Sequence, residues 1–163
     1  MVGRENAPLL VKENAFQDIE GNPLKFFAAV VGGKSVGTPG TPALLEEAYK
    51  RWGKIEWSLL FKDAINLSNN GFVISKKLSS SIKRSKSSLS KFLNTKTYFL
   101  PNDIPLKSGN IHYNKEYAET LKAFAKKGSK VFYQGFLADD IVSTVNNASI
   151  NPGVLSLKDM HDY

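Results

Sequence analysis

The chain has 163 residues, a formal net charge of +7 and no cysteine. This length is enough for one domain with a buried core, and 42% apolar with 23% charged residues is a globular rather than a disordered composition. The lack of cysteine excludes a disulfide scaffold, a thiolate nucleophile and a cysteine-ligated metal. The polar start Met1–Pro8 has no apolar signal core, and the apolar run Phe26–Val31 is too short to cross a bilayer. As written, the product is expected to be soluble and cytoplasmic.

The first 42 residues form the part of the chain in which loops and strands are expected. Turn signals stand at Gly21–Pro23, Gly32–Gly33 and Gly37–Pro42. Two short extended pieces are predicted between them, near Val2–Asn6 and Ser35–Thr38.

Residues 43–163 have a helical pattern. Thr41 as N-cap and Pro42 at the first helical position begin one helix, which Gly53 ends. Ser75 and Asn114 are predicted caps of two later helices. Apolar residues at helical spacing predict helices over 42–52, 57–70, 75–93, 114–127 and 137–145, with a last one from 157 onward.

The predicted fold class is therefore mainly α, with one or two short strands. Phe132–Gly135 is predicted as a turn, and Trp52, Trp57 and Phe132 as packing residues. The last helix begins at Leu157 and can run for two turns at most. A helix this short has little stability of its own without packing against other parts of the fold. We therefore expect residues 1–163 to be a single segment of a larger fold, truncated at both ends.

Positive charge is concentrated in one stretch. Between Phe72 and Asn102 there is no acid, and the cations are Lys76, Lys77, Lys83, Arg84, Lys86, Lys91 and Lys96. Such a run suits nucleic acid or an anionic membrane. A solvated helix face is the favoured interpretation, because no aromatic residue stands among the charges from Lys76 to Lys91 to stack on bases.

Residue types that carry chemistry are sparse. His112, expected in a loop, and His161 are the two histidines, and no cluster has metal-ligand spacing. The pairs Glu46–Glu47 and Asp139–Asp140 are adjacent on predicted helices, where neighbouring side chains diverge. Gly32–Ser35 lacks the spacing of a phosphate loop. These residues predict no metal, no cofactor and no assembled active site.

Four blocks, taken in order, carry a family resemblance. They are Arg4–Pro8, then Ser35–Thr41 leading into Leu45–Lys54, then Trp57–Ile65 with Asn70–Ser75 and Leu78, and finally Tyr117–Leu121 with Gly128, Val131–Gly135, Ala138, Ile141–Val142 and Leu157–Tyr163. In this order and spacing they resemble the large subunit of γ-glutamyltranspeptidases over nearly the whole chain.

The resemblance implies an N-terminal-nucleophile hydrolase with an αββα sandwich in the intact family. Such enzymes are transferases and hydrolases that cleave themselves, and the new N-terminal threonine of the small subunit takes the γ-glutamyl group of glutathione as an acyl-enzyme. That threonine stands in a Thr-Thr-His-x-Ser stretch, which this sequence lacks. The resemblance therefore implies no catalytic residue here, and the chain alone is expected to be inactive. Intact bacterial members are periplasmic or secreted.

One binding residue carries over from the family. Arg4 matches the arginine that binds the α-carboxylate of the γ-glutamyl group, a task for which the guanidinium fork is suited. Without the motif, an ordinary ion pair with Glu5 would be the favoured interpretation. Two alternatives remain for the chain as a whole: half of a split enzyme completed by a separate small-subunit chain, or a basic helical binding module.

Overall fold

The computed structural model describes residues 3–163; Met1 and Val2, where one predicted extended piece begins, lie outside the described residues. The chain divides into two compact units. Unit 1 contains Met1–Trp57 and Ala123–Tyr163, and unit 2 contains Ser58–Lys122. Helices dominate both, so the predicted mainly α class is confirmed.

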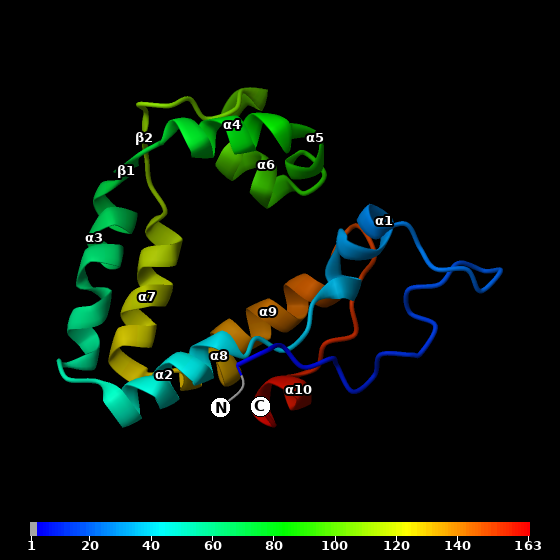
Figure 1. The fold of residues 1–163 in the computed structure, drawn as a ribbon, viewed down its shortest axis with the longest axis horizontal. Coiled ribbons are helices and arrows are strands. Elements are labelled where there is room, and N and C mark those ends of the chain that lie inside the picture. The colour runs from blue at the N-terminus through cyan, green and yellow to red at the C-terminus, as the bar shows by residue number, and fades with distance from the viewer. Residues whose placement is uncertain (1–2) are drawn as a thin grey trace. The chain divides into compact units, whose positions relative to one another are not determined.

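Figure 1 shows the order of the elements. Those of unit 1 are α1 (Phe26–Val30), the 3₁₀ turn η1 (Gly33–Ser35), α2 (Thr41–Trp52), α8 (Lys130–Tyr133), α9 (Phe136–Asn146) and α10 (Leu157–His161). Unit 2 has α3 (Lys62–Asn70), β1 (Phe72–Val73), α4 (Lys76–Arg84), α5 (Lys86–Leu89), α6 (Leu93–Phe99), η3 (Pro101–Asp103) and β2 (Ile111–His112). The turn η2 (Trp57–Phe61) and helix α7 (Lys115–Lys127) contain residues of both units.

Helix α2 ends at the predicted residue but begins one residue earlier, and its caps differ from the predicted ones. Gly40, not Thr41, is the N-cap residue, and Pro42 lies in the first turn. At the other end Gly53 has extended backbone angles (φ −61°, ψ 135°) rather than the left-handed ones expected of a C-terminal glycine. The amide of Gly53 still donates to the Tyr49 carbonyl at 2.7 Å, so the last turn of the helix closes without a left-handed residue.

An aromatic cluster in unit 1 joins residues of four elements, α2, η2, α7 and α8. The Trp57 ring lies 4.9 Å from the Tyr49 ring and 5.3 Å from Phe124, which in turn contacts Phe132 at 5.0 Å. The Trp57 indole N–H donates to the Phe124 carbonyl at 3.1 Å. The packing predicted for Trp57 and Phe132 is thus present. Trp52, at the end of α2, is instead 67% exposed, so the prediction for that residue is wrong.

The helix predicted from Ser75 to Leu93 is divided into α4, α5 and the start of α6. Its beginning is as predicted, because the Ser75 hydroxyl accepts from the Leu78 amide at 3.1 Å. The break between α5 and α6 occurs where hydroxyl side chains bond to nearby carbonyls. The Ser90 hydroxyl donates to the Lys86 carbonyl at 2.8 Å, and the Thr95 hydroxyl donates to the Leu89 carbonyl at 2.7 Å. Such local bonds compete with regular helix, which explains the interruption.

The strands lie elsewhere than the sequence suggests. Strands β1 and β2 pair antiparallel, with Phe72 opposite His112, so the prediction that His112 lies in a loop is wrong. Two-residue strands have no alternation to detect. In the described part of the first 42 residues, the predicted extended pieces contribute only an isolated bridge between Asn6 and Thr38.

The remaining helices agree with the predicted pattern. Asn114 accepts from the Tyr117 amide at 2.9 Å to begin α7, and Gly128 follows that helix with φ +71°. The predicted turn at Phe132–Gly135 is only half correct, because Phe132 and Tyr133 still belong to α8. Helix α1 lies where the sequence predicts a loop, so that prediction is wrong for Phe26–Val30. The apolar core of unit 1 lies between α9 and the C-terminal segment and contains Ala138, Val145, Leu155 and Met160, with Tyr133, Ile141 and Val142 against it.

Candidate functional site

Arg4 lies near the start of unit 1 in a segment without regular secondary structure, and its side chain is exposed. The guanidinium Nη2 is 3.1 Å from Glu5 Oε1, and the two side chains are 81% and 60% exposed. This is the ordinary ion pair considered above. Because exposed pairs of this kind contribute little to stability, Glu5 is a weak competitor for a ligand carboxylate.

The backbone of the same segment is hydrogen-bonded to distant parts of the sequence. The Asn6 amide donates to Thr38 O at 3.3 Å, and the Thr38 amide donates back to Asn6 O at 2.9 Å. The Leu9 amide donates to Asp159 Oδ1 at 2.8 Å, and the Tyr163 hydroxyl donates to Arg4 O at 2.9 Å. The main chain around Arg4 is therefore held while the guanidinium remains accessible.

Asp159 is a buried charged residue, at 7% exposure. Its Oδ2 accepts from the Ser156 amide at 2.8 Å and from the Ser156 hydroxyl at 2.6 Å. The Asp159 amide donates in return to Ser156 Oγ at 3.1 Å, which completes a capping box at the start of α10. Burial raises the pKa of this carboxyl, but the hydrogen bonds from Ser156 and Leu9 outweigh it and bring the pKa below 3.8. Asp159 is thus a negatively charged group at neutral pH. The spacing of Ser156 and Asp159 could have revealed the box, but not the contact with Leu9.

The adjacent carboxylate pairs do not form acid–base sites. Glu46 accepts from the Ser129 amide at 2.7 Å and pairs with Lys50 at 3.2 Å, whereas Glu47 pairs with Arg51 at 2.8 Å. Burial raises the pKa of Glu46, but the hydrogen bonds from Ser129 and the charge of Lys50 outweigh burial and keep the pKa below 4.5. Asp139 and Asp140 are both exposed on α9.

His112 is enclosed by aromatic rings within unit 2. Its ring lies 4.4 Å from Tyr98 and 6.0 Å from Phe72. Its Nε2 is buried, and among the described residues it has no hydrogen-bond partner. Burial lowers the pKa of His112 below 6.5. A lone neutral imidazole without a carboxylate or nucleophile beside it is a structural group rather than a catalytic one. His161, the other histidine, lies 3.4 Å from Asp162 on the surface.

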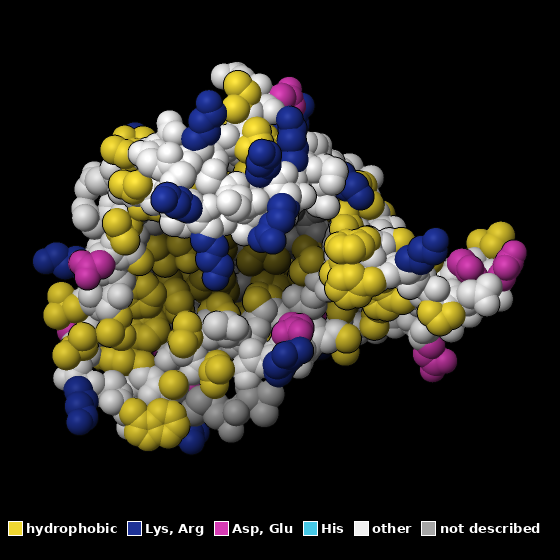
Figure 2. Space-filling model, turned by 45° about the horizontal axis from the view of Figure 1, so that its top comes forward, with side chains coloured by type: hydrophobic (Ala, Val, Ile, Leu, Met, Phe, Trp, Pro, Cys, Tyr) yellow, Lys and Arg dark blue, Asp and Glu magenta, His cyan; other side chains and the backbone are white. Residues whose placement is uncertain are grey.

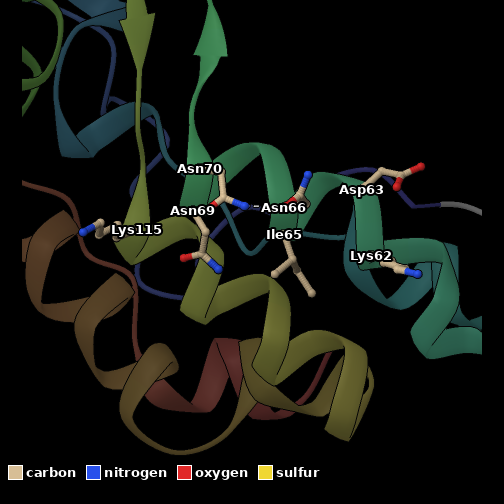
Figure 3. Close-up of a pocket in the computed structure, with 7 residues that line it drawn as sticks. All are labelled: Lys62, Asp63, Ile65, Asn66, Asn69, Asn70 and Lys115. Atoms are coloured by element: carbon tan, nitrogen blue, oxygen red, sulfur yellow. Dashed lines mark hydrogen bonds between the residues drawn. The ribbon is translucent and has the colours of Figure 1, made fainter.

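A wide groove lies along α3 and the start of α7, with a volume of about 770 Å³. Figure 3 shows its lining residues: Lys62, Asp63, Ile65, Asn66, Asn69, Asn70 and Lys115. The Asn70 side-chain Nδ2 donates to Asn66 Oδ1 at 2.5 Å, and Asp63 and Lys115 lie at opposite ends of the row. The charged groups do not converge on one point, so the groove lacks the arrangement of an acid–base site.

The basic stretch is on the surface of unit 2. Figure 2 shows dark blue side chains over the helices at the top of the view. All the cations named above for this stretch are exposed except Lys96, which is half-buried and pairs with Asp103 at 2.7 Å. The solvated helix face that the sequence favours agrees with this exposure.

Among residues 3–163, no group of three or more histidine, aspartate or glutamate side chains is placed to hold a metal ion. None of the helices in that range is long and apolar enough to cross a membrane.

Comparison with known proteins covers the whole chain. The sequence model of the γ-glutamyltranspeptidase family matches residues 1–163. The glutathione hydrolase proenzyme of Bacillus subtilis subsp. natto is 36% identical over 160 residues, which are 98% of this chain and 27% of that protein. The chain thus spans about a quarter of the length of this curated relative.

Solved structures give the same result. The chain is similar to Helicobacter pylori γ-glutamyltranspeptidase with a TM-score of 0.90 and 30% identity, over 99% of this chain and 45% of that one. For the Pseudomonas nitroreducens γ-glutamyltranspeptidase the TM-score is 0.85 and the identity 28%, over 99% and 46%. Since the family model and the structures agree along the full length, the chain belongs to the γ-glutamyltranspeptidase family.

Proposed function

We propose that residues 1–163 supply the donor-carboxylate site of a γ-glutamyl-transferring or glutathione-hydrolysing enzyme, with Arg4 as the binding residue. The nucleophile comes from polypeptide outside these residues, either continuous with them or as a separate small-subunit chain. The observation that carries the proposal is an exposed guanidinium on a fixed backbone, in a chain that matches the family throughout.

The chemistry of the arginine supports this role. A guanidinium can bind both oxygens of an α-carboxylate with two parallel hydrogen bonds, which fixes orientation as well as adding energy. Its present partner, Glu5, is the next residue and solvent-exposed. An incoming carboxylate would therefore replace a weak pair rather than a buried one.

The nucleophile is the part of the chemistry that these residues do not contain. Neither His112 nor His161 follows a threonine, so the family's Thr-Thr-His-x-Ser stretch is absent from residues 1–163. Incubation of the chain alone with a chromogenic γ-glutamyl anilide should release no anilide above background. Turnover by the chain alone would contradict this part of the proposal.

The binding role is tested in a completed enzyme, in which residues 1–163 replace the matching segment of the Bacillus subtilis subsp. natto relative. Arg4→Ala should lower kcat/KM for the γ-glutamyl anilide by roughly 10- to 150-fold, the equivalent of about 1.5–3 kcal/mol for a hydrogen bond to a charged group. Arg4→Lys keeps the charge but loses the fork, so it should recover only part of the loss.

Arg51→Ala is the matched control, because Arg51 is also an exposed arginine paired with a glutamate. It should leave kcat/KM unchanged within about twofold, as expected for an exposed ion pair. If Arg4→Ala behaves like Arg51→Ala, or if a folded completed enzyme has no activity, Arg4 is not the donor-carboxylate residue.

A further inference from the structure

Residues in and near α10 hydrogen-bond to the main chain of the segment that carries Arg4. Tyr163, two residues after α10, bonds to the Arg4 carbonyl, and Asp159, within α10, bonds to the Leu9 amide. Between these two points Asn6 is paired with Thr38, whose side chain is 1% exposed and donates to Asp159 O at 3.5 Å. Three points of contact therefore hold the backbone from Arg4 to Leu9.

Tyr163 is itself held in place by a second tyrosine. The rings of Tyr133 and Tyr163 are stacked, with centroids 5.5 Å apart and an interplanar angle of 5°. The Tyr133 hydroxyl donates to Pro39 O at 2.7 Å and accepts from the Ala43 amide at 3.2 Å. The direction of the Tyr163 hydroxyl is thereby set by the turn that begins α2.

Gly40 leaves the space in which this contact forms. A Cβ atom at position 40 would overlap the Tyr163 hydroxyl and the carbonyl of Arg4, and would lie 2.7 Å from that of Gly3. The backbone angles of Gly40 are ordinary (φ −96°, ψ −24°), so the close approach, not conformation, explains the glycine. The segment that carries Arg4, the α2 turn and Tyr163 thus meet at one point.

We propose that Tyr163 is a positioning residue for Arg4, with Asp159 as the second anchor of the same segment. This inference rests on the proposed function of Arg4. Two-point binding of a carboxylate requires a well-placed guanidinium, and a shift of about 1 Å can cost much of the benefit of orientation. Tyr163 sets this placement through the Arg4 main chain and leaves the side chain free for the ligand.

The test is Tyr163→Phe in the completed enzyme, since this change removes one oxygen and keeps the stacked ring. KM for the γ-glutamyl donor should rise about 3- to 10-fold with kcat nearly unchanged, because the α-carboxylate is bound alike in ground state and transition state. Tyr117→Phe, at a half-exposed tyrosine of α7, is the matched control and should change neither constant.

A double-mutant cycle with Arg4→Ala separates positioning from general stability. The Arg4 carbonyl persists in Arg4→Ala, so a purely structural effect of Tyr163→Phe would remain in that background. A positioning effect would vanish there, because no guanidinium is left to orient. Additive effects, or an unchanged KM in Tyr163→Phe alone, would overturn the inference. If Arg4→Ala itself has no effect, the proposed function fails instead.

Discussion

At the scale of single residues, Arg4 and His112 are placed in opposite ways. Arg4 has a fixed main chain and an exposed charge, which suits a group that must meet a ligand. His112 has a buried nitrogen without a partner among the described residues, which suits a group that must stay neutral. The first is available for binding, whereas the second makes the structure sensitive to acid.

The stability of unit 2 is expected to fall in weak acid because of His112. Its pKa in the folded chain is lowered from 6.5 by burial, so the unfolded chain takes up the proton first. Its contribution is complete above pH 6.5 and is lost as pH falls toward the lower folded pKa. Because one proton is involved, the free energy of unfolding changes by at most about 1.4 kcal/mol per pH unit.

His112→Leu should remove this slope and leave the free energy of unfolding at pH 7.5 nearly unchanged. Urea unfolding of both proteins at pH 7.5 and pH 5.5 measures the difference. An equal loss of stability in the variant would show that another group carries the acid dependence.

At the scale of the elements, α4 depends on one capping residue more than on its interior. The Ser75 hydroxyl satisfies the Leu78 amide, whereas serines occupy three consecutive positions, Ser79–Ser81, and Ile82 is the one buried residue of the helix. A helix with so little apolar burial gains comparatively more from its cap.

Ser75→Ala is therefore expected to destabilise unit 2 by roughly 1 kcal/mol, the usual cost of losing an N-cap. Ser80→Ala, at an exposed interior position of the same helix, should be neutral or slightly stabilising, because alanine is the better helix former. Thermal unfolding followed by circular dichroism measures both. Equal midpoints for the two variants would contradict the role of the cap.

Element types could be predicted where caps and apolar spacing agree. Ser75, Asn114 and the glycine after α7 marked real boundaries. The division of the 75–93 helix could not be predicted, because serines that fit a helical surface also bond to its carbonyls. Similarly, β1 and β2 are defined by pairing across the chain and have no local signal.

At the scale of the whole molecule, many large apolar side chains are exposed. Phe26 and Phe27 are 72% and 71% exposed, Leu9 and Leu10 are both 66% exposed, and Figure 2 shows further apolar groups on the visible face. A net charge of +7 opposes association of such surfaces in low salt.

Self-association of the isolated chain is accordingly expected to increase with salt, because screening removes the repulsion between like-charged molecules. The double variant Phe26→Ser and Phe27→Ser should reduce the effect, whereas Lys91→Ser should not. Sedimentation velocity at about 20 mM and 500 mM NaCl measures the self-association of each protein. The Debye lengths at these concentrations are roughly 20 Å and 4 Å. Association that weakens in salt would indicate contacts between opposite charges instead.

The sequence by itself determined the family, the mainly α class and Arg4 as the candidate binding residue, because these depend on local pattern and on the order of motifs. The tertiary structure alone decided that Tyr163 and Asp159 hold the Arg4 segment and that His112 is buried among aromatic rings. The physical reason is sequence distance. Residues 4 and 163 meet only after the chain has folded, and no local propensity encodes a contact across 159 positions.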